Sequence, residues 1–293
     1  MLDKERWFSE PCKDAGNAIS YEIDAHLHHE KSEFQTIDIY KTTHFGHLMA
    51  IDGFIMLTQR DNFLYHEMMT HPALFTHDRP QDVVVVGGGD CGTLREVLRH
   101  AGVKSCLQVE IDERVTRLAE QYFPELCSAN EDPRAAFKFD DAIRHMAEAE
   151  DESLDVIIID STDPVGPAEG LFGPSFMANC FRTLRPGGII VQQSESPLIH
   201  QELIGQIRGN MTQAGFDAIK TLCFPQSCYP SGWWSATMAG KGRDLSQYRQ
   251  ADIAQRDFKT EYYNEGIHAG ALHLPEFLRR ALEHSPENAS NSQ

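Results

Sequence analysis

Apolar and polar positions follow a strand pattern in the N-terminal part of the chain. Within the first ~60 residues, apolar residues alternate with polar ones or form short apolar runs. Asp52-Gly53 lies between two such runs and predicts a hairpin, because both residues tolerate a positive φ. We predict a small antiparallel β domain over 1–62, in which the apolar residues around the hairpin pack either locally or against a second subunit. The predicted strands are 18–30, 34–42 and 47–59.

From about residue 82, short apolar runs alternate with segments of helical period. This alternation is typical of an α/β domain with a doubly wound, mostly parallel sheet, which we assign to residues 63–284. The polar tail 285–293 is expected to be disordered. Predicted strands are 82–86, 105–111, 135–140, 154–160, 187–193, 217–224 and 233–240. Predicted helices are 93–101, 112–123, 175–184 and 197–215, with a further helix after the strand 135–140.

The segment VVVVGGGDCGTLREV (83–97) joins a buried strand to a helix. Gly87, Gly89 and Gly92 match the G-x-G-x-x-G pattern, whose turn lies beyond the carboxyl end of the strand, where such sheets bind ligands. Glu110 ends the next strand, and its carboxylate is placed to accept hydrogen bonds from both ribose hydroxyls. The pattern favours a nucleoside site over the alternative, a tight turn beside a surface glutamate.

Asp90 in the glycine turn bears on the kind of nucleotide. A dehydrogenase would place a pyrophosphate against this carboxylate, which is unfavourable, whereas an S-adenosyl donor has no phosphate. RTLRPGGIIV (182–191) is similar to the entry to the fifth strand of class I methyltransferase folds. We therefore expect a methyltransferase-like (Rossmann-type) sheet and an adenosyl sulfonium ligand. Pro186-Gly187-Gly188 taken alone is also an ordinary helix stop.

A second acidic segment, VIIIDSTDPVGP (156–167), follows the fourth strand of this domain. Asp160 ends the strand and Asp163 follows three residues later, on a loop that two prolines stiffen. With Asp90 nearby, buried carboxylates at this edge require a cationic ligand. The competing interpretations are an Asx turn that caps the next helix and a metal site, although the loop lacks a dense oxygen-ligand pattern.

Composition narrows the class of protein. The 293 residues carry a formal net charge of −18, which suits cationic ligands and repels nucleic acid, although it also serves solubility alone. We expect neither a membrane span nor a signal peptide, because no apolar run of about 18 residues exists and the first residues are charged. Seven cysteines without zinc spacing predict reduced thiols, a cytoplasmic protein and no metal site.

Several segments resemble the polyamine aminopropyltransferases, the spermidine synthase family. They are YHEMMTHPAL, VVVVGGGDCGTLREV, VEID, IIDSTDPVGP and YYNEGIHAGALHLPEF. The resemblance extends from about Trp7 to Phe277 and implies transfer of an aminopropyl group from decarboxylated S-adenosylmethionine to a diamine, usually putrescine. Spermidine and methylthioadenosine would be the products. It also implies a homodimer or homotetramer and no cofactor, because the donor is a co-substrate.

The resemblance implies a role for each matching residue. Asp160 would be the catalytic acid/base residue, Asp163 would bind the diamine, and Asp90 would hold the aminopropyl amine of the donor. The remaining donor-binding residues would be Gln35, Gly87, Gly89, Glu110, Asp141, Ala142 and Pro167. The remaining acceptor-binding residues would be Tyr65, His66, Gln193 and Tyr229 along the amine channel, with Trp7 at its far end.

Four positions depart from the family pattern. Cys91 and Ala142 stand where relatives have glycine, and the Trp233-Trp234 pair adds bulk that would shorten an acceptor pocket if either ring entered it. The sequence leaves open an acceptor other than putrescine, such as cadaverine, agmatine or spermidine. It also leaves open a non-catalytic relative that binds polyamines.

Overall fold

The computed structural model describes residues 3, 6–164 and 166–283, and for Pro167 only the backbone. The predicted tail 285–293 lies outside these residues. The N-terminal part forms a five-stranded antiparallel sheet in which consecutive strands are neighbours, so the predicted β domain is confirmed. Its strands are β1 (Trp7–Cys12), β2 (Asn17–Lys31), β3 (Thr36–Thr42), β4 (His47–Ile51) and β5 (Phe54–Thr58).

The second sheet has seven strands in the order β11-β12-β10-β9-β6-β7-β8. Strands β10, β9, β6, β7 and β8 are parallel, and β12 pairs antiparallel with both β10 and β11. The predicted doubly wound, mostly parallel sheet is therefore confirmed. Its strands are β6 (Asp82–Gly87), β7 (Ser105–Glu110), β8 (Ala135–Phe139), β9 (Leu154–Asp160), β10 (Leu184–Gln193), β11 (Ala218–Pro225) and β12 (Trp233–Gly240).

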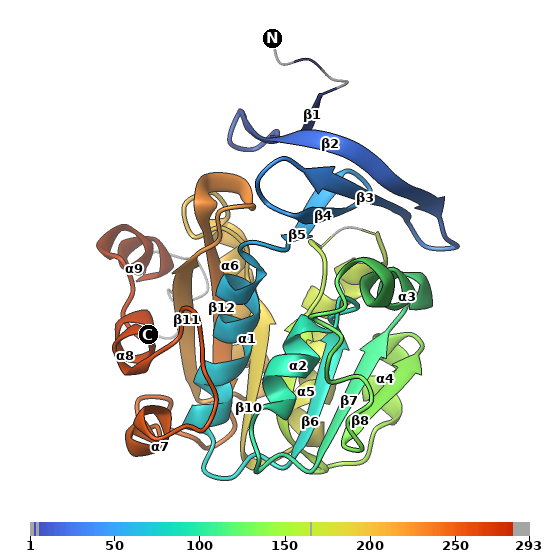
Figure 1. Cartoon of the computed structure of the whole chain (residues 1–293). Helices are drawn as coiled ribbons and strands as arrows, with labels where there is room; N and C mark the ends of the chain where they lie inside the picture. The colour runs from blue at the N-terminus through green and yellow to red at the C-terminus, as the bar shows by residue number, and fades with distance from the viewer. Residues whose placement is uncertain (1–2, 4–5, 165, 284–293) are drawn as a thin grey trace.

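Helices cover both faces of this sheet (Figure 1). Alternate residues of β6 explain the two layers: Val83 and Val85 pack with α1 and α2, whereas Val84 and Val86 pack with α4, α5 and α6. The helices are α1 (Asn62–Thr76), α2 (Gly92–Leu98), α3 (Glu113–Tyr122), α4 (Ala142–Glu148), α5 (Pro174–Thr183), α6 (Gln201–Ala214), α7 (Gln250–Ala254), α8 (Glu265–Ala271) and α9 (Glu276–Glu283), with short 3-10 helices η1 (Gly166–Phe172) and η2 (Pro230–Gly232).

The N-terminal sheet packs on α3, next to the carboxyl ends of the parallel strands (Figure 1). Its hairpin residues, including Leu48, Met49 and Leu57, are buried within this chain, against α3 on one side and Cys228 and Tyr229 on the other. Local packing therefore accounts for the apolar hairpin. None of the helices in the described ranges has the length and apolar character that crossing a bilayer requires.

Several elements differ from the sequence pattern, and β1 and the C-terminal helices α7, α8 and α9 were not predicted. The helix α1 was not predicted, because nearly every residue from Tyr65 to Thr76 is buried and the helix shows no polar face. Strand β10 begins at Leu184, three residues before the predicted start. The turn at Pro186-Gly187-Gly188 is instead an irregularity within the strand, with Gly187 at φ +85° and a register shift before Ile189.

The order of the strands creates the crevice that holds the site. From β6 the chain moves outward through β7 and β8, then returns to the other side of β6 through β9 and β10. Ligands of open α/β sheets bind where the direction of winding reverses. Gly87 at the end of β6 and Asp160 at the end of β9 are register partners at this point.

Candidate active site

The glycine turn after β6 needs residues without side chains because other groups approach it closely. Gly87 has φ +78°, and a Cβ there would lie 2.3 Å from the carbonyl oxygen of Asp160. The backbone N–H of Gly88 donates to that same oxygen at 2.7 Å. A Cβ on Gly92 would lie 2.2 Å from the ring of His66. The turn is thereby held against the loop that follows β9.

Asp90 is held as a carboxylate by its neighbours. Its Oδ1 accepts a 2.7 Å hydrogen bond from the backbone N–H of Gly92, and its Oδ2 lies 3.2 Å from Nε2 of His66. Burial raises the pKa of Asp90, but His66, this backbone N–H and the charge of Arg95 together outweigh it, and the net pKa is lowered. The pKa of His66 is raised because Asp90 outweighs the effect of its burial.

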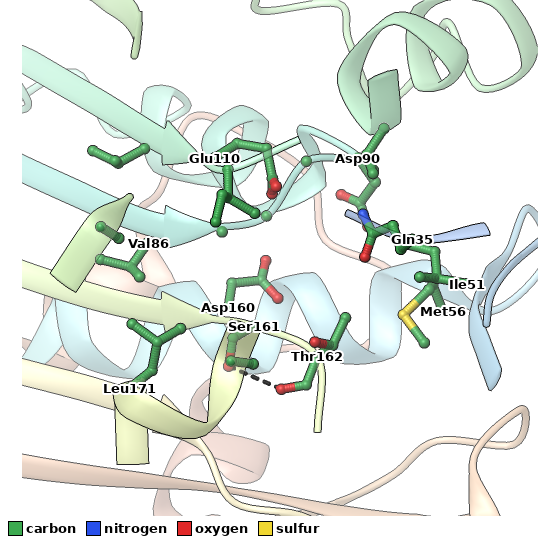
Figure 2. Close-up of a pocket in the computed structure, with 18 of the residues that line it drawn as sticks. Gln35, Ile51, Met56, Val86, Asp90, Glu110, Asp160, Ser161, Thr162 and Leu171 are labelled. Atoms are coloured by element: carbon green, nitrogen blue, oxygen red, sulfur yellow. Dashed lines mark hydrogen bonds between the residues drawn. The ribbon is translucent and has the colours of Figure 1, made fainter. Parts of the chain in front are cut away.

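The pKa of Asp160, in contrast to that of Asp90, is raised. Its Oδ1 accepts a 2.7 Å hydrogen bond from the Tyr65 hydroxyl, and its Oδ2 accepts one of 2.5 Å from the Thr93 hydroxyl. Burial and the negative charge of Asp90 raise its pKa, and His66 and the two hydroxyls offset this only in part. Figure 2 shows the Asp160 and Glu110 side chains directed into one space.

A cavity extends from Asp160 along the glycine turn to the end of β7. Glu110 lies at that end, and burial, followed by the charges of Asp112 and Asp160, raises its pKa to about 7. The hydrogen bond that it accepts from the backbone N–H of Asp112 lowers the pKa but does not cancel this effect. The cavity has polar groups at its ends and apolar walls, as small-molecule sites usually have. Its lining includes Gln35, Met49, Ile51, Met56, Leu57, Tyr65, Val86, Gly87, Gly88, Gly89, Asp90, Glu110, Ile111, Asp141, Ala142, Asp160, Ser161, Thr162, Leu171 and Tyr229.

Two of these residues are fixed by neighbouring backbone or side chains. Asp141 caps α4, where its carboxylate accepts a 2.8 Å hydrogen bond from the N–H of Ile143. Gln35, just before β3, donates to Asp112 at 3.0 Å. The N-terminal sheet therefore supplies one wall of the cavity and the α/β domain supplies the other.

A second cavity adjoins the first and shares Met56, Tyr65, Ser161, Thr162 and Tyr229 with it. Its other lining residues are Glu10, Phe54, Ile55, Asp163, Gln193, Pro230 and Trp234. Carboxyl groups line it without a lysine or arginine among these residues. The arrangement is suited to a ligand with positive charge along an apolar body.

The carboxyl groups of this second cavity hold protons unusually tightly. Burial, then the charge and hydrogen bond of Glu195, raises the pKa of Asp163 to about 8. Burial also raises the pKa of Glu10 to about 7, although its Oε2 accepts a 2.6 Å hydrogen bond from the N–H of Ile55. Burial raises the pKa of Glu195 as well, although its hydrogen bonds with Asp163 and Gln193 lower it.

The structure brings most of the predicted residues to these two cavities. Gln35, Gly87, Gly89, Asp90, Glu110, Asp141, Ala142, Tyr65, Asp160 and Tyr229 line the first, and Tyr65, Asp163, Gln193 and Tyr229 line the second. His66 lines neither and acts on the site through its contact with Asp90. Trp7 lines neither and pairs with Glu22 of β2. The side chain of Pro167 lies outside the described residues.

Sequence reasoning missed Glu10 and Glu195. Glu195 has φ +65°, and its backbone N–H donates to Gln193 at 3.1 Å. It follows the carboxyl end of β10, so the rule that directed attention to Asp160 applied to it too. Glu10 comes from β1, and no sequence signal connects it to Asp163.

The structure shows where Cys91, Trp233 and Trp234, which depart from the family pattern, are placed. Cys91 adopts the left-handed conformation, φ +67°, at the start of α2. Trp234 lines the second cavity and its ring lies 4.5 Å from that of Tyr229, whereas Trp233 packs on Phe277 at 5.6 Å. One tryptophan therefore narrows the cavity and the other supports the outer packing.

Two protein-family models match most of the chain. The family model described as "Spermine/spermidine synthase domain" matches residues 62–248, and the one described as "Spermidine synthase tetramerisation domain" matches residues 6–59. Proteins named polyamine aminopropyltransferase from Nitrosococcus oceani and Methylococcus capsulatus are both 58% identical to the chain. The matches cover 97% and 96% of this chain, and 100% and 99% of theirs.

Solved structures give the same result. A crystal structure of a spermidine synthase in complex with the transition-state analogue AdoDATO superposes with a TM-score of 0.92. The spermidine synthase from Thermotoga maritima superposes with a TM-score of 0.90. Each is 30% identical in sequence, and each match covers 96% of both chains.

Proposed function

Because the chain belongs to the spermidine synthase family of polyamine aminopropyltransferases, we propose that it transfers the aminopropyl group of decarboxylated S-adenosylmethionine to putrescine. One observation carries the proposal. Asp90 follows the turn at Gly87–Gly89 and Asp160 lies beside Gly87 at its start, one with a lowered and one with a raised pKa, next to a second cavity lined by carboxyl groups.

The first cavity takes the donor. Glu110 accepts hydrogen bonds from the ribose hydroxyls, Asp141 accepts one from the adenine amino group, and Gln35 and Ala142 complete the nucleoside site. Asp90 holds the terminal ammonium of the aminopropyl group. The positioning of Asp90 by His66 and the Gly92 N–H supports this role, because an ionised carboxylate is needed there.

The second cavity takes the diamine. Asp163, with Glu195 behind it and Glu10 across the cavity, binds the distant ammonium, and Tyr229, Gln193 and Trp234 enclose the methylene chain. Tyr65 lies between the two cavities and orients Asp160 through a 2.7 Å hydrogen bond. Trp7 lines neither cavity, so we assign it no part in enclosing the diamine.

The reaction joins the acceptor nitrogen to the propyl carbon next to sulfur. The carbon–sulfur bond breaks, its electron pair remains on sulfur, and methylthioadenosine leaves as a neutral thioether. The attacking amine must first be neutral, and for an alkyl amine with a lysine-like pKa of roughly 10.4 this costs about 4.6 kcal/mol at pH 7. Asp160 accepts that proton, for which its raised pKa is suited.

The sulfonium is already a good leaving group, and the fixed geometry of the two substrates supplies much of the remaining rate enhancement. The proposal therefore includes no cofactor, with the donor as a co-substrate. It also includes a cytoplasmic homodimer or homotetramer. The match of residues 6–59 to the tetramerisation model supports an oligomer, which light scattering on the purified protein tests directly.

The test of the proposal is incubation of the purified protein with decarboxylated donor and a mixture of putrescine, cadaverine, agmatine and spermidine. Mass spectrometry identifies the products. Spermidine from putrescine is the expected product. Product from another amine alone would assign the same chemistry to a different acceptor.

Absence of any product, while calorimetry still shows donor binding, would make the protein a non-catalytic relative.

The Trp234 ring favours the shortest acceptors, because it occupies the wall of the second cavity beside Tyr229. We therefore expect little turnover of spermidine.

A further inference from the structure

Three potential metal ligands meet on the N-terminal sheet, among residues that line neither cavity of the active site. Nε2 of His26 and Nδ1 of His29 both lie 2.7 Å from Oδ1 of Asp38. The two histidines come from β2 and the aspartate from β3, the paired strands that run across the top of Figure 1. All three ligand atoms lie within 4.8 Å of one another.

A bulge in β2 explains why these side chains share one face. Residues three apart in a regular strand point to opposite faces of the sheet. In β2, His26 pairs with Tyr40 and His28 with Ile39, so that Leu27 is an extra residue without a partner. The extra residue reverses the alternation and places His26 on the same face as His29, which pairs directly with Asp38.

The opposite face of the same strand is already occupied. His28 lies there, with its ring 5.9 Å from that of Tyr122, and its partner Ile39 is buried against α3. The faces are therefore distinct in chemistry. One packs on the α/β domain, and the other presents imidazoles and a carboxylate to solvent.

The exposure of the three groups suits an ion that arrives from solution. The His26 and His29 side chains are 42% and 62% exposed, whereas that of Asp38 is 14% exposed. Tyr40 stacks on the His26 ring at 4.4 Å and restricts its orientation. Within the described part of the chain, the ion-pair partners of Asp38 are these two imidazoles and no lysine or arginine.

We propose that His26, His29 and Asp38 form a surface site for a divalent transition-metal ion, with Zn²⁺ as the best fit. Two imidazole nitrogens and one carboxylate oxygen are a donor set that Zn²⁺ takes in sites where water completes the coordination. Tetrahedral Zn²⁺ needs ligand atoms about 3.3 Å apart. Exposed side chains reach that separation from 2.7 Å by small torsional changes. The bound ion would tie β2 to β3.

The test uses the full-length protein without a histidine tag, after treatment with a chelator. Zinc binding is measured by calorimetry, and Co²⁺ is added separately as a spectroscopic probe of imidazole coordination. We expect one high-affinity Zn²⁺ per chain and a higher melting temperature with zinc. His26→Ala, His29→Ala and Asp38→Asn should each weaken binding at least about tenfold, the loss that even supporting residues of metal sites cause.

His28→Ala is the matched control, because it removes a histidine from the same strand on the opposite face. It should retain zinc with wild-type affinity. Circular dichroism establishes that each variant is folded. The proposal is overturned if the wild-type protein takes up no zinc. It is equally overturned if His28→Ala loses zinc as fully as His26→Ala, or if the double variant of His26 and His29 keeps it.

Discussion

Asp90 and Asp160 carry the same side chain, yet their surroundings move their pKa values in opposite directions. Asp90 faces His66 and a backbone N–H, which favour the charged form. Burial and the negative charge of Asp90 favour the protonated form of Asp160, and His66 and the hydroxyls of Thr93 and Tyr65 offset them only in part. Two carboxyl groups with separated pKa values are typical of sites that divide binding and proton transfer between them.

The first prediction concerns Asp160. Asp160→Asn keeps an oxygen that can accept a hydrogen bond from Tyr65 or Thr93 but cannot take the proton of the amine. We expect kcat to fall by about 10²–10⁴-fold, the usual contribution of a general base. Donor affinity should fall far less, because Asp90 remains. Steady-state kinetics and calorimetry with the donor separate the two effects, and equal losses of both would contradict the assignment.

The second prediction concerns the choice of donor by Asp90. Ordinary S-adenosylmethionine carries a carboxylate that the decarboxylated donor lacks. Two carboxylates at ~4 Å repel by about 4 kcal/mol at an effective dielectric constant of 20, which corresponds to roughly a thousandfold preference. Asp90→Asn should therefore weaken binding of the decarboxylated donor and remove most of the preference. Competition binding of the two donors measures it, and an unchanged affinity for the decarboxylated donor would refute the proposed contact.

At the scale of elements, the sequence predicted strands better than it predicted irregularities. The runs at 82–86 and 154–160 are apolar on both faces, so β6 and β9 were recognisable. Helix α1 was missed because it is buried on nearly all sides, which removes the amphipathic period. The bulge at Leu27 was equally hidden, since a two-residue period is assumed when histidine spacings are judged. Both features depend on tertiary contacts.

The third prediction concerns the first turn of α2. Cys91 is fully buried and holds φ +67°, a conformation that is unfavourable for a residue with a Cβ. Cys91→Gly and Cys91→Ala both remove the sulfur, but only glycine relieves the backbone. We expect the glycine variant to have a free energy of unfolding about 1 kcal/mol higher than the alanine variant. Urea denaturation tests this, and equal values would mean that the turn relaxes without cost.

For the whole molecule, the acceptor cavity depends on parts of the chain that are distant in sequence. Glu10 lies on β1, Asp163 follows β9 and Glu195 follows β10, and they meet because the N-terminal sheet covers the carboxyl ends of the parallel strands. The sequence rule for such sheets directs attention to those strand ends, so it found Asp163. It contains no information about which edge of a second sheet packs over them, and so Glu10 was not predicted.

These carboxyl groups make the empty protein sensitive to pH. The pKa values of Asp163 and Glu10 in the folded protein, about 8 and about 7, lie above their ordinary values of 3.8 and 4.5. The folded state therefore holds more protons than the unfolded state between about pH 4 and 8. The stability that the protonated groups contribute is fully present below about pH 4 and is lost as the pH rises through 7 and 8.

The last prediction is that diamine binding displaces the proton that Asp163 holds in the folded protein. An ammonium beside Asp163 favours its charged form, so binding at pH 7 should release about one proton. Calorimetry at pH 7 in two buffers of different ionisation enthalpy measures the release, and diamine affinity should rise from pH 6 to 8. Asp163→Asn should lower the proton release and flatten the pH dependence, whereas Asp160→Asn should leave the Asp163 contribution in place. Binding heats that are independent of the buffer would show that the cavity carboxyls are already ionised, and the proposed basis of acceptor recognition would be wrong.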